Sequence, residues 1–424
     1  MIKKLLIIII TIFTFSQAGA EPVIKVLKNG IRVVLYETRT TNLVGVSILF
    51  SGGTRFEKKE EKGVFRLLEL MLPRGTETRT EEMITEQISL LGDSFSISTT
   101  GEFWSLEATV VNDNLKDLLD LSKDILFDPA FSEVNLSKVK KMAIQTIKAS
   151  EDSPWSHMSE LYRAVFYPQF YAEKDTRITN IRNTKKSTIM RIHSEYFTPE
   201  NMIIAIAGDI DQQGTIDLID QIFGTLHHGV SSRQTEPKQQ DTPLPLYRAQ
   251  GGGITQAGIL IGTRLKGFNR RDEHLLMLLG AVLDNSLGGR LYEEMREEKG
   301  LVYSISTHYS LSVKPYTWFI FSTSRKKNIK SVIDTTEDVI KELKRKPATD
   351  AELELAKEYL KTSLAISYLT PLTVANYNGV QLLRDEVPES LLERTIEIDS
   401  VSPQELDLFI NKYFPKQWTK LVIR

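Results

Sequence analysis

The chain repeats one joint between a helix and a strand at a fixed distance along its sequence. Tyr196-Phe197 leads into a predicted strand at residues 202–207, and Tyr413-Phe414 leads into another predicted strand at residues 420–423. Ile181 and Ile398, upstream of the two joints, are separated by the same offset as the two Tyr-Phe pairs. Repetition at a fixed offset indicates duplication of one unit, although two unrelated joints can also match by chance. We therefore predict two similar α+β domains.

The length and composition of the chain agree with this division. Its 424 residues are too many for one ordinary hydrophobic core, so two domains of about 200 residues each are expected. The formal net charge of −2 gives no electrostatic reason to expect nucleic acid or an anionic membrane as a partner. Because the chain has no cysteine, disulfides, cysteine nucleophiles and thiolate metal sites are excluded.

The segment from Met1 to Ala20 has the pattern of a secretory signal peptide. Lys3 and Lys4 precede an apolar run at residues 5–15, and Ala18-Gly19-Ala20 supplies small residues for cleavage. The alternative is a retained membrane anchor, but this run would span only about 16 Å as a helix, roughly half of a bilayer core. We expect export to the periplasm or another extracytoplasmic space, with no stable membrane insertion after the signal is removed.

The first domain is predicted to comprise residues 21–226. Alternating apolar runs on both sides of Asn29-Gly30 predict a β-hairpin. Helical periodicity is present at residues 63–72 and Thr80 opens a second helix, while long amphipathic helices occupy most of residues 114–197. The other strands of this domain are expected at residues 44–50, 94–98, 103–111 and 202–207.

Residues 227–252 are rich in glycine, proline, serine and glutamine, which predicts a linker between domains. The second domain is then assigned to residues 253–424. Its strands are expected at residues 254–261, 301–309, 317–322 and 420–423, separated by long helices.

The predicted helix at residues 63–72 lies in a segment that resembles a known family signature. Residues 63–76 resemble the Gly-x-x-His-x-x-Glu-His-Met signature of insulinase-type zinc peptidases, in which two histidines bind zinc and the glutamate activates water. The positions that match this signature are Gly63, Leu68, Glu69, Met71, Leu72, Gly75 and Thr76.

Both histidines of the signature are replaced. Arg66 stands at the first ligand position and Leu70 at the second, and a guanidinium repels a metal cation at any relevant pH. The resemblance puts the third ligand at Gln145 or Thr146, upstream of the matching Glu151-Asp152-Ser153-Pro154. We therefore expect no metal in this chain.

Glu69 is the catalytic glutamate position of the same signature. We hypothesise that Arg66, three residues away, pairs with Glu69 and takes the place of the missing metal charge. The alternative is that Glu69 is simply an exposed glutamate on the helix surface.

A second motif lies in the second domain. Residues 284–306 are similar to the Arg-Leu-Phe-x-Glu-x-Arg-Glu-x-x-Gly-Leu-Ala-Tyr-Ser stretch of the same family. We expect a helix over residues 290–298, a stop at Lys299-Gly300 and a strand from Leu301, with a tight bend that brings Arg296 near Tyr303.

The resemblance implies that Arg296 and Tyr303, seven residues apart, contact substrate at a zinc site supplied by another chain. A guanidinium and a phenol are suitable donors to a developing oxyanion. The alternative is structural: Arg296 pairs with Glu293 on an exposed face, and Tyr303 belongs to the core.

The whole mature chain thus resembles the insulinase/pitrilysin family, of the inverzincin and mitochondrial-processing-peptidase-like type. The resemblance implies two homologous domains, each an antiparallel sheet packed against helices, that form half of a clamshell. It also implies an accessory subunit of an exported heteromeric zinc endopeptidase, inactive alone, with zinc and the intact H-x-x-E-H motif in a homologous partner subunit and a peptide or unfolded polypeptide as substrate. The alternatives are a non-catalytic scaffold and a peptide-binding protein of the same fold.

Overall fold

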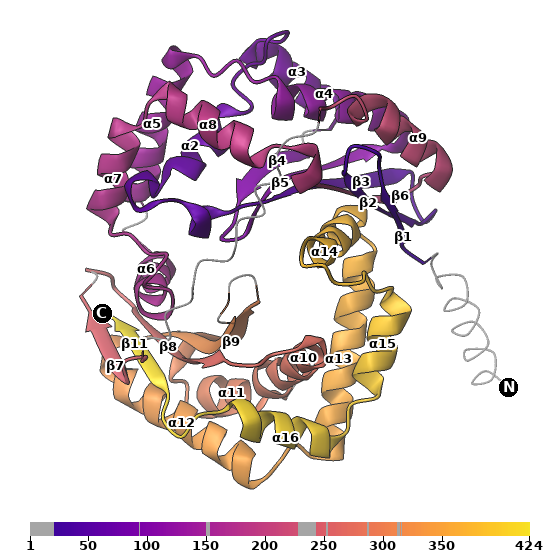
Figure 1. Ribbon diagram of the computed structural model, residues 1–424. Coiled ribbons are helices and arrows are strands. Elements are labelled where there is room, and N and C mark those ends of the chain that lie inside the picture. Colours follow the sequence, from indigo (N-terminus) through magenta and orange to yellow (C-terminus); the bar gives the residue numbers. More distant parts are fainter. Residues whose placement is uncertain are drawn as a thin grey trace, which may run out of the picture. The chain divides into compact units, whose positions relative to one another are not determined.

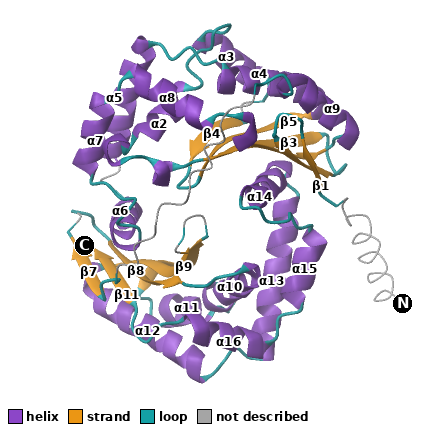
Figure 2. Cartoon of the chain, in the orientation of Figure 1, coloured by secondary structure: helices purple, strands orange, loops and turns teal. Residues whose placement is uncertain are grey.

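The computed structural model describes residues 21–92, 94–149, 153–227, 243–251, 253–285, 288–311, 314 and 316–424. The predicted signal peptide and most of the predicted linker lie outside these residues. The chain divides into two compact units, each a mixture of helices and one sheet (Figures 1 and 2). The predicted two-domain α+β class is therefore confirmed. None of the helices within the described residues is both long and apolar enough to cross a membrane.

The first unit is built on a six-stranded sheet. β1 and β2 form the predicted hairpin, whose register pairs Val23 with Leu35 and Val26 with Arg32. β2 and β6 are parallel, and all other neighbours in this sheet are antiparallel. The strand order is β1 (Val23–Val26), β2 (Arg32–Glu37), β6 (Met202–Gly208), β3 (Leu43–Ser51), β5 (Phe103–Val111) and β4 (Phe95–Thr99).

Helices pack against this sheet and extend its core. Most of the buried residues on these strands are aliphatic or aromatic, with Ser47 and Ser105 as polar exceptions, and β6 is buried at every position. The helices that lie wholly within the unit are α2 (Val64–Met71), α3 (Glu81–Leu90), α4 (Leu115–Phe127), α8 (Lys186–Tyr196), α9 (Gln212–Phe223) and α14 (Pro371–Leu383).

The second unit has a five-stranded sheet of the same design. β7 and β11 are parallel and the other neighbours are antiparallel. The strand order is β7 (Tyr247–Gln250), β11 (Thr419–Ile423), β8 (Ala257–Leu265), β10 (Tyr316–Ser324) and β9 (Val302–Ser310). Its helices are α6 (Pro154–Phe166), α10 (Arg270–Asp284), α11 (Arg290–Tyr292), a π-helical turn (Glu293–Glu298), α12 (Ile329–Arg345) and α16 (Pro403–Tyr413).

Four further helices cross the boundaries between the two units along the chain. They are α5 (Glu133–Ala149), α7 (Lys174–Asn183), α13 (Asp350–Tyr368) and α15 (Leu391–Asp399).

The two sheets confirm that one unit is duplicated. In each, the strand that follows the Tyr-Phe pair lies between a parallel neighbour and an antiparallel one. Trp104 on β5 packs against Phe197 with ring centroids 5.5 Å apart, and Trp318 on β10 packs against Phe414 at 5.0 Å. The sheets are mixed rather than purely antiparallel because each contains one parallel pair, β2 with β6 and β7 with β11, whose strands are far apart in the sequence.

Each sheet also carries a helix from the opposite half of the sequence. α14 packs on β3 and β6 of the first sheet (Figure 1), and α6 packs on β8 and β11 of the second. Pro371 and Pro154 occupy the first turns of these two helices and are separated by the same offset as the two Tyr-Phe pairs. The compact units are therefore not the contiguous segments 21–226 and 253–424: the first includes residues 364–394 and the second includes residues 144–176.

The second sheet begins within the segment predicted as linker. β7 pairs in parallel with β11, with Tyr247 opposite Lys420 and Gln250 opposite Ile423. A short, fully exposed edge strand has no buried face, so its sequence shows no alternation of apolar and polar residues. For this reason the sequence of residues 247–250 predicts a linker instead of a strand.

Candidate functional site

The degenerate metal motif lies on α2, and a buried carboxylate caps the start of this helix. Gly63 precedes the helix with φ of 98°, a left-handed conformation that favours glycine. Glu57 Oε1 accepts the main-chain N–H groups of Gly63 at 3.0 Å and Phe65 at 2.7 Å. Burial raises the pKa of Glu57 to about 7, although these two hydrogen bonds and the charge of Lys62 oppose the rise. Sequence analysis did not identify Glu57 as part of this region.

Arg66 and Glu69 form an ion pair on the face of α2. The Glu69 side chain is 7% exposed, whereas that of Arg66 is 48% exposed. Burial raises the pKa of Glu69, and the positive charge of Arg66 and the contact with Thr99 at the end of β4 act in the opposite direction. Glu69 is therefore not an exposed surface residue, and the hypothesised pairing with Arg66 is present.

The remaining ligand positions of the motif do not suit a metal. Leu70 is partly exposed and offers no donor atom, while Gln145 and Thr146 on α5 are exposed and uncharged. The guanidinium of Arg66 places a permanent positive charge beside the Glu69 carboxylate, the group that would activate water in a zinc site. The residues present thus do not fit zinc. Across the described residues, no three His, Cys, Asp or Glu side chains are grouped so that they could hold a metal ion.

The second motif forms a helix that widens before it ends. α11 is followed by the π-helical turn, in which Lys299 N donates to Glu294 O at 3.2 Å and Leu301 N donates to Met295 O at 2.8 Å. Gly300 then takes φ of 55°, which ends the helix where the sequence predicts a stop. Such π-helical turns occur frequently at functional sites.

The bend after this turn brings Arg296 to Tyr303, as the sequence predicts. Arg296 Nη1 donates a hydrogen bond to the main-chain carbonyl of Tyr303. The guanidinium also lies over the Tyr292 ring, 5.8 Å from its centroid. Tyr303 is 45% exposed, so it is not the core residue that the structural alternative requires.

A β-bulge determines where Tyr303 lies on β9. Thr323 of β10 pairs with Ser304, but the next residue, Ser324, pairs with Val302. Tyr303 is therefore the extra residue of the bulge and stands outside the regular pairing. Bulges of this kind redirect a side chain and are common beside active sites.

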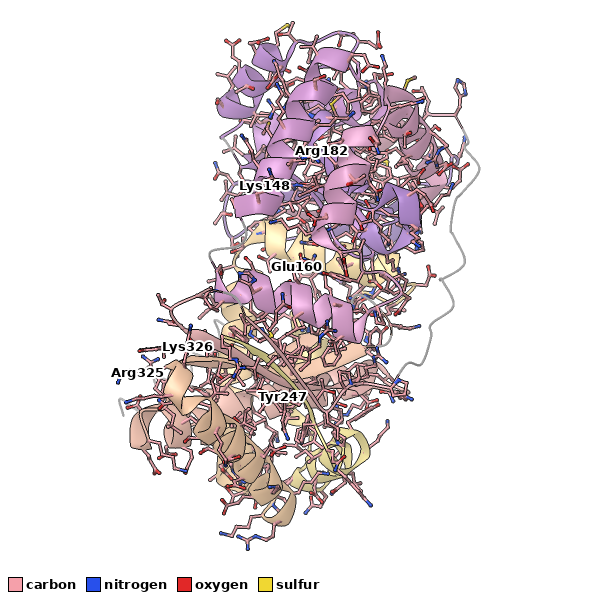
Figure 3. All side chains as sticks on the ribbon, turned by 90° about the vertical axis from the view of Figure 1, so that its left-hand side faces the viewer. Lys148, Glu160, Arg182, Tyr247, Arg325 and Lys326 are labelled. Carbon is pink, nitrogen blue, oxygen red and sulfur yellow. The ribbon has the colours of Figure 1, made fainter. Side chains whose placement is uncertain are left out.

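A second arginine, which sequence analysis missed, reaches the phenol of Tyr303. Arg325 Nε donates to Tyr303 Oη at 3.1 Å. This hydrogen bond raises the pKa of Arg325, whose guanidinium is in any case cationic at every relevant pH. Figure 3 shows Arg325 beside Lys326 at the periphery of the second unit. The expected pairing of the strands at residues 301–309 and 317–322 could have predicted this contact, because it places the start of the first strand beside the end of the second. The basic run at residues 325–327, however, is more typical of a solvated surface.

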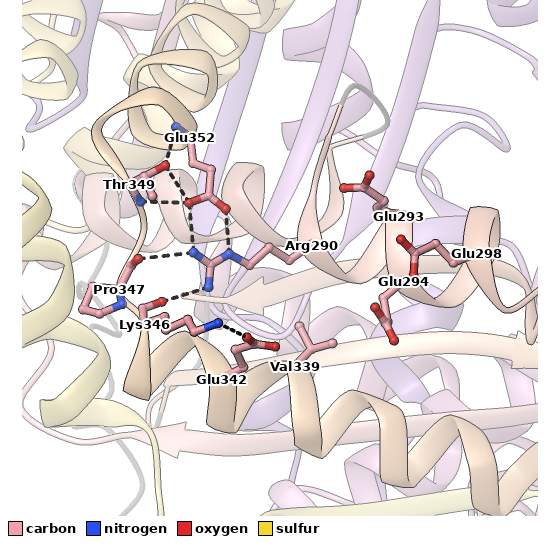
Figure 4. Close-up of a pocket in the computed structure, with 10 residues that line it drawn as sticks. All are labelled: Arg290, Glu293, Glu294, Glu298, Val339, Glu342, Lys346, Pro347, Thr349 and Glu352. Carbon is pink, nitrogen blue, oxygen red and sulfur yellow. Dashed lines mark hydrogen bonds and ion pairs between the residues drawn. The ribbon is translucent and has the colours of Figure 1, made fainter.

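The helix that holds Arg296 is anchored through Arg290 (Figure 4). Arg290 contacts Glu352 through Nε at 2.7 Å and Nη2 at 2.9 Å, and its Nη1 donates to the Lys346 carbonyl at 2.9 Å. This bidentate contact lowers the pKa of Glu352 to about 2. These side chains line an open pocket of about 400 Å³ that is also lined by Glu293, Glu294, Glu298, Val339, Glu342, Pro347 and Thr349.

The two sheets of similar topology, the metal motif without its ligands on α2 and the Arg296–Tyr303 motif define a peptidase-like protein built from two related α+β units. The chain belongs to the insulinase family, peptidase family M16. Residues 32–174 match the family model described as insulinase (peptidase family M16), and residues 186–360 match the model of the peptidase M16 inactive domain.

Individual relatives agree with this assignment. The chain is 25% identical over 401 residues to YmxG, an uncharacterized zinc protease of Bacillus subtilis, covering 93% of this chain and 96% of that protein. It is 22% identical over 344 residues to an uncharacterized zinc protease of Rickettsia bellii, covering 80% of this chain and 82% of that protein.

Solved structures share the fold. A protease from Helicobacter pylori matches with a TM-score of 0.85 at 18% identity, over 96% of this chain and all of that one. A peptidase M16 inactive domain from Pseudomonas fluorescens matches with a TM-score of 0.86 at 16% identity, over 95% of this chain and 97% of that one. The periplasmic protease PqqL of Escherichia coli matches with a TM-score of 0.77 at 14% identity, and this chain covers 47% of its length.

Proposed function

We propose that this chain is the accessory subunit of an exported, heteromeric zinc endopeptidase. The single observation that carries the proposal is the contrast between the two motifs of the chain. On α2, Arg66 is paired with Glu69 and Leu70 replaces the second ligand, whereas Arg296 and Tyr303 are brought together and Tyr303 stays exposed. A chain that keeps the second motif without the first can complete a site whose metal belongs to a partner.

The chemistry of each part follows from its residues. The partner, a homologous H-x-x-E-H subunit, would supply zinc and the water that attacks the peptide bond. Arg296 and Tyr303 would bind the substrate carbonyl and stabilise the oxyanion as the carbonyl becomes tetrahedral. Arg66 would occupy the place of the metal charge beside the buried Glu69, and the rest of the chain would form one wall of the chamber and bind the extended peptide.

The location of the protein is part of the same proposal. The signal peptide predicted at residues 1–20 supports export, and the related fold of a periplasmic protease agrees with it. A test is fractionation of native cells, followed by N-terminal sequencing of the protein. We expect a periplasmic chain that begins at Glu21; recovery of the intact N-terminus from the cytoplasm would contradict export.

The test of function is reconstitution. The chain would first be tagged and recovered from its native organism under gentle conditions, with partners identified by mass spectrometry. The purified chain, the recovered H-x-x-E-H partner and their mixture would then be assayed on an unfolded polypeptide. We expect cleavage by the mixture, its loss on chelation of zinc, and no cleavage by this chain alone.

Substitutions at the second motif separate an accessory subunit from a scaffold. Arg296→Ala and Tyr303→Phe should each lower kcat of the mixture by about 100-fold, because removal of one oxyanion donor costs about 2.7–4 kcal/mol. Lys327→Ala, in the exposed basic run nearby, is the matched control and should leave kcat unchanged. Full turnover by the Arg296→Ala/Tyr303→Phe double variant would favour a scaffold, and tight peptide binding by this chain alone would favour a peptide-binding protein.

A further inference from the structure

We propose that Arg325 is a positioning residue that turns the phenol of Tyr303 into a hydrogen-bond donor aimed at substrate. This proposal rests on the function proposed above, and it adds a residue outside the Arg296–Tyr303 motif. Arg325 follows β10 directly, and its Nε lies 3.1 Å from Tyr303 Oη.

The direction of this hydrogen bond follows from the chemistry of the two groups. A guanidinium has five N–H donors and no acceptor, whereas a phenol has one O–H donor and lone pairs that accept. In the contact with Arg325, the Tyr303 oxygen must therefore accept. Its own O–H is left to donate to another group, which is the role that a developing oxyanion requires. A cation on the far side of the oxygen also strengthens this donor.

Tyr303 is held at both ends by arginines from different segments. Arg296, in the π-helical turn, binds its main-chain carbonyl, and Arg325, after β10, binds its phenol oxygen. An exposed tyrosine on an edge strand would otherwise sample several rotamers. Because the two arginines hold the Tyr303 side chain in one rotamer, substrate binding does not have to supply the conformational entropy lost in ordering it.

The segment that carries Arg325 is itself fixed to the start of β9. Ser324 Oγ donates to the Leu301 carbonyl at 2.8 Å, and Asn328 Nδ2 donates to the same carbonyl at 3.3 Å. Asn328 N also closes the turn by donating to the Arg325 carbonyl at 2.9 Å. Because Leu301 lies two residues before Tyr303, these hydrogen bonds join the segment that carries Arg325 directly to the start of the strand that carries the bulge.

A structural test uses this chain alone and does not depend on any partner. The protein would be labelled with 3-fluorotyrosine, and the ¹⁹F signal of residue 303 would be assigned with Tyr303→Phe. We expect Arg325→Ala to shift or broaden this signal, and Lys326→Ala, which removes the adjacent positive charge, to leave it in place. A Tyr303 signal that does not change in Arg325→Ala would overturn the proposal.

A kinetic test uses the reconstituted complex and a double-mutant cycle. Arg325→Ala should lower kcat about ten-fold with little change in KM, and it should have no further effect when Tyr303 is already phenylalanine. An equal ten-fold loss in the Tyr303→Phe background would overturn the proposal, because Arg325 would then act on substrate directly. If the wild-type complex shows no turnover, the proposed function fails, and the fluorine signal still decides whether Arg325 positions Tyr303.

Discussion

The Arg66 guanidinium forms an ion pair with the Glu69 carboxylate one turn further along α2. The two members of the pair are in different environments, since the Glu69 side chain is almost fully buried and that of Arg66 is half exposed. A buried carboxylate without a partner is costly, whereas an exposed arginine without one is not. The pair therefore stabilises the fold mainly by compensating the charge of Glu69.

This asymmetry predicts the effect of removing either partner. Arg66→Ala should lower the free energy of unfolding at pH 7 by about 1–2 kcal/mol, because it leaves the charge of a buried carboxylate compensated only by the contact with Thr99. The Arg66→Ala/Glu69→Gln double variant should recover most of this loss. Urea denaturation of the two variants and the wild type measures both effects.

The pH dependence provides the control. Burial raises the folded pKa of Glu69, so at a pH below the ordinary glutamate value of about 4.3 the carboxyl is protonated in the folded and unfolded states alike. The loss in Arg66→Ala should therefore shrink at acidic pH. A loss of the same size at pH 4 and pH 7 would show that Arg66 acts through packing instead of charge.

Glu57 predicts a second pH effect of definite sign. Its folded pKa is raised to about 7, so between the ordinary value and pH 7 the folded state binds more protons than the unfolded state. The free energy of unfolding should then fall as pH rises from 5 to 7, by on the order of 2–3 kcal/mol. Glu57→Gln keeps an oxygen that accepts from Gly63 and Phe65, and it should abolish this part of the slope. Identical slopes for the wild type and the variant, measured by urea denaturation, would refute the assignment.

Much of this fold was predictable from the sequence. The Asn29-Gly30 turn, the strand at residues 103–111 and the helix cap at Thr80 are local features, each specified by a few neighbouring residues, and all three occur as predicted. The duplication was visible because the joint at Tyr196-Phe197 recurs at Tyr413-Phe414.

The features that sequence analysis missed depend on distant parts of the chain. The apolar residues of α14 are not confined to one face of the helix, and its buried positions include Asn378 and Gln381, so its sequence does not indicate which sheet it covers. A signal was available in Pro154 and Pro371, which share the same offset as the Tyr-Phe pairs. Glu57 and Arg325 lie in charged runs that are typical of solvated surfaces. The role of Glu57 follows from its burial, and that of Arg325 follows from its contact with Tyr303 on the neighbouring strand.

The contact between Arg290 and Glu352 predicts how stability changes under acidic conditions. The folded pKa of Glu352 is lowered to about 2, so its contribution is present above the ordinary glutamate pKa and is lost as pH falls toward 2. Glu352→Gln should lower the free energy of unfolding at pH 7 by about 1 kcal/mol, a value reduced for solvent screening because the side chain is 30% exposed.

Measurements at pH 7 and pH 3, with and without 1 M salt, test this contribution. The difference between Glu352→Gln and the wild type should shrink at low pH and at high salt. Glu293→Gln, an exposed residue that lines the same pocket, is the matched control and should be nearly neutral. If the two variants are equally stable, the bidentate contact does not anchor the motif helix.

Finally, the contact between α14 and the first sheet depends on a position that has no side chain. A Cβ at Gly45 would lie 2.1 Å from the main-chain nitrogen of Leu372 and 2.4 Å from its Cα, at the start of α14, so it would overlap main-chain atoms. Gly45→Ala should therefore lower the free energy of unfolding by about 2–3 kcal/mol through overpacking and should weaken hydrogen-exchange protection in α14. Gly258, on β8 against α6, is the matched control, because its Cβ would meet neighbours at ordinary distances of 3.4 Å and beyond. Equal stability of Gly45→Ala and Gly258→Ala would show that α14 is not held tightly on this sheet.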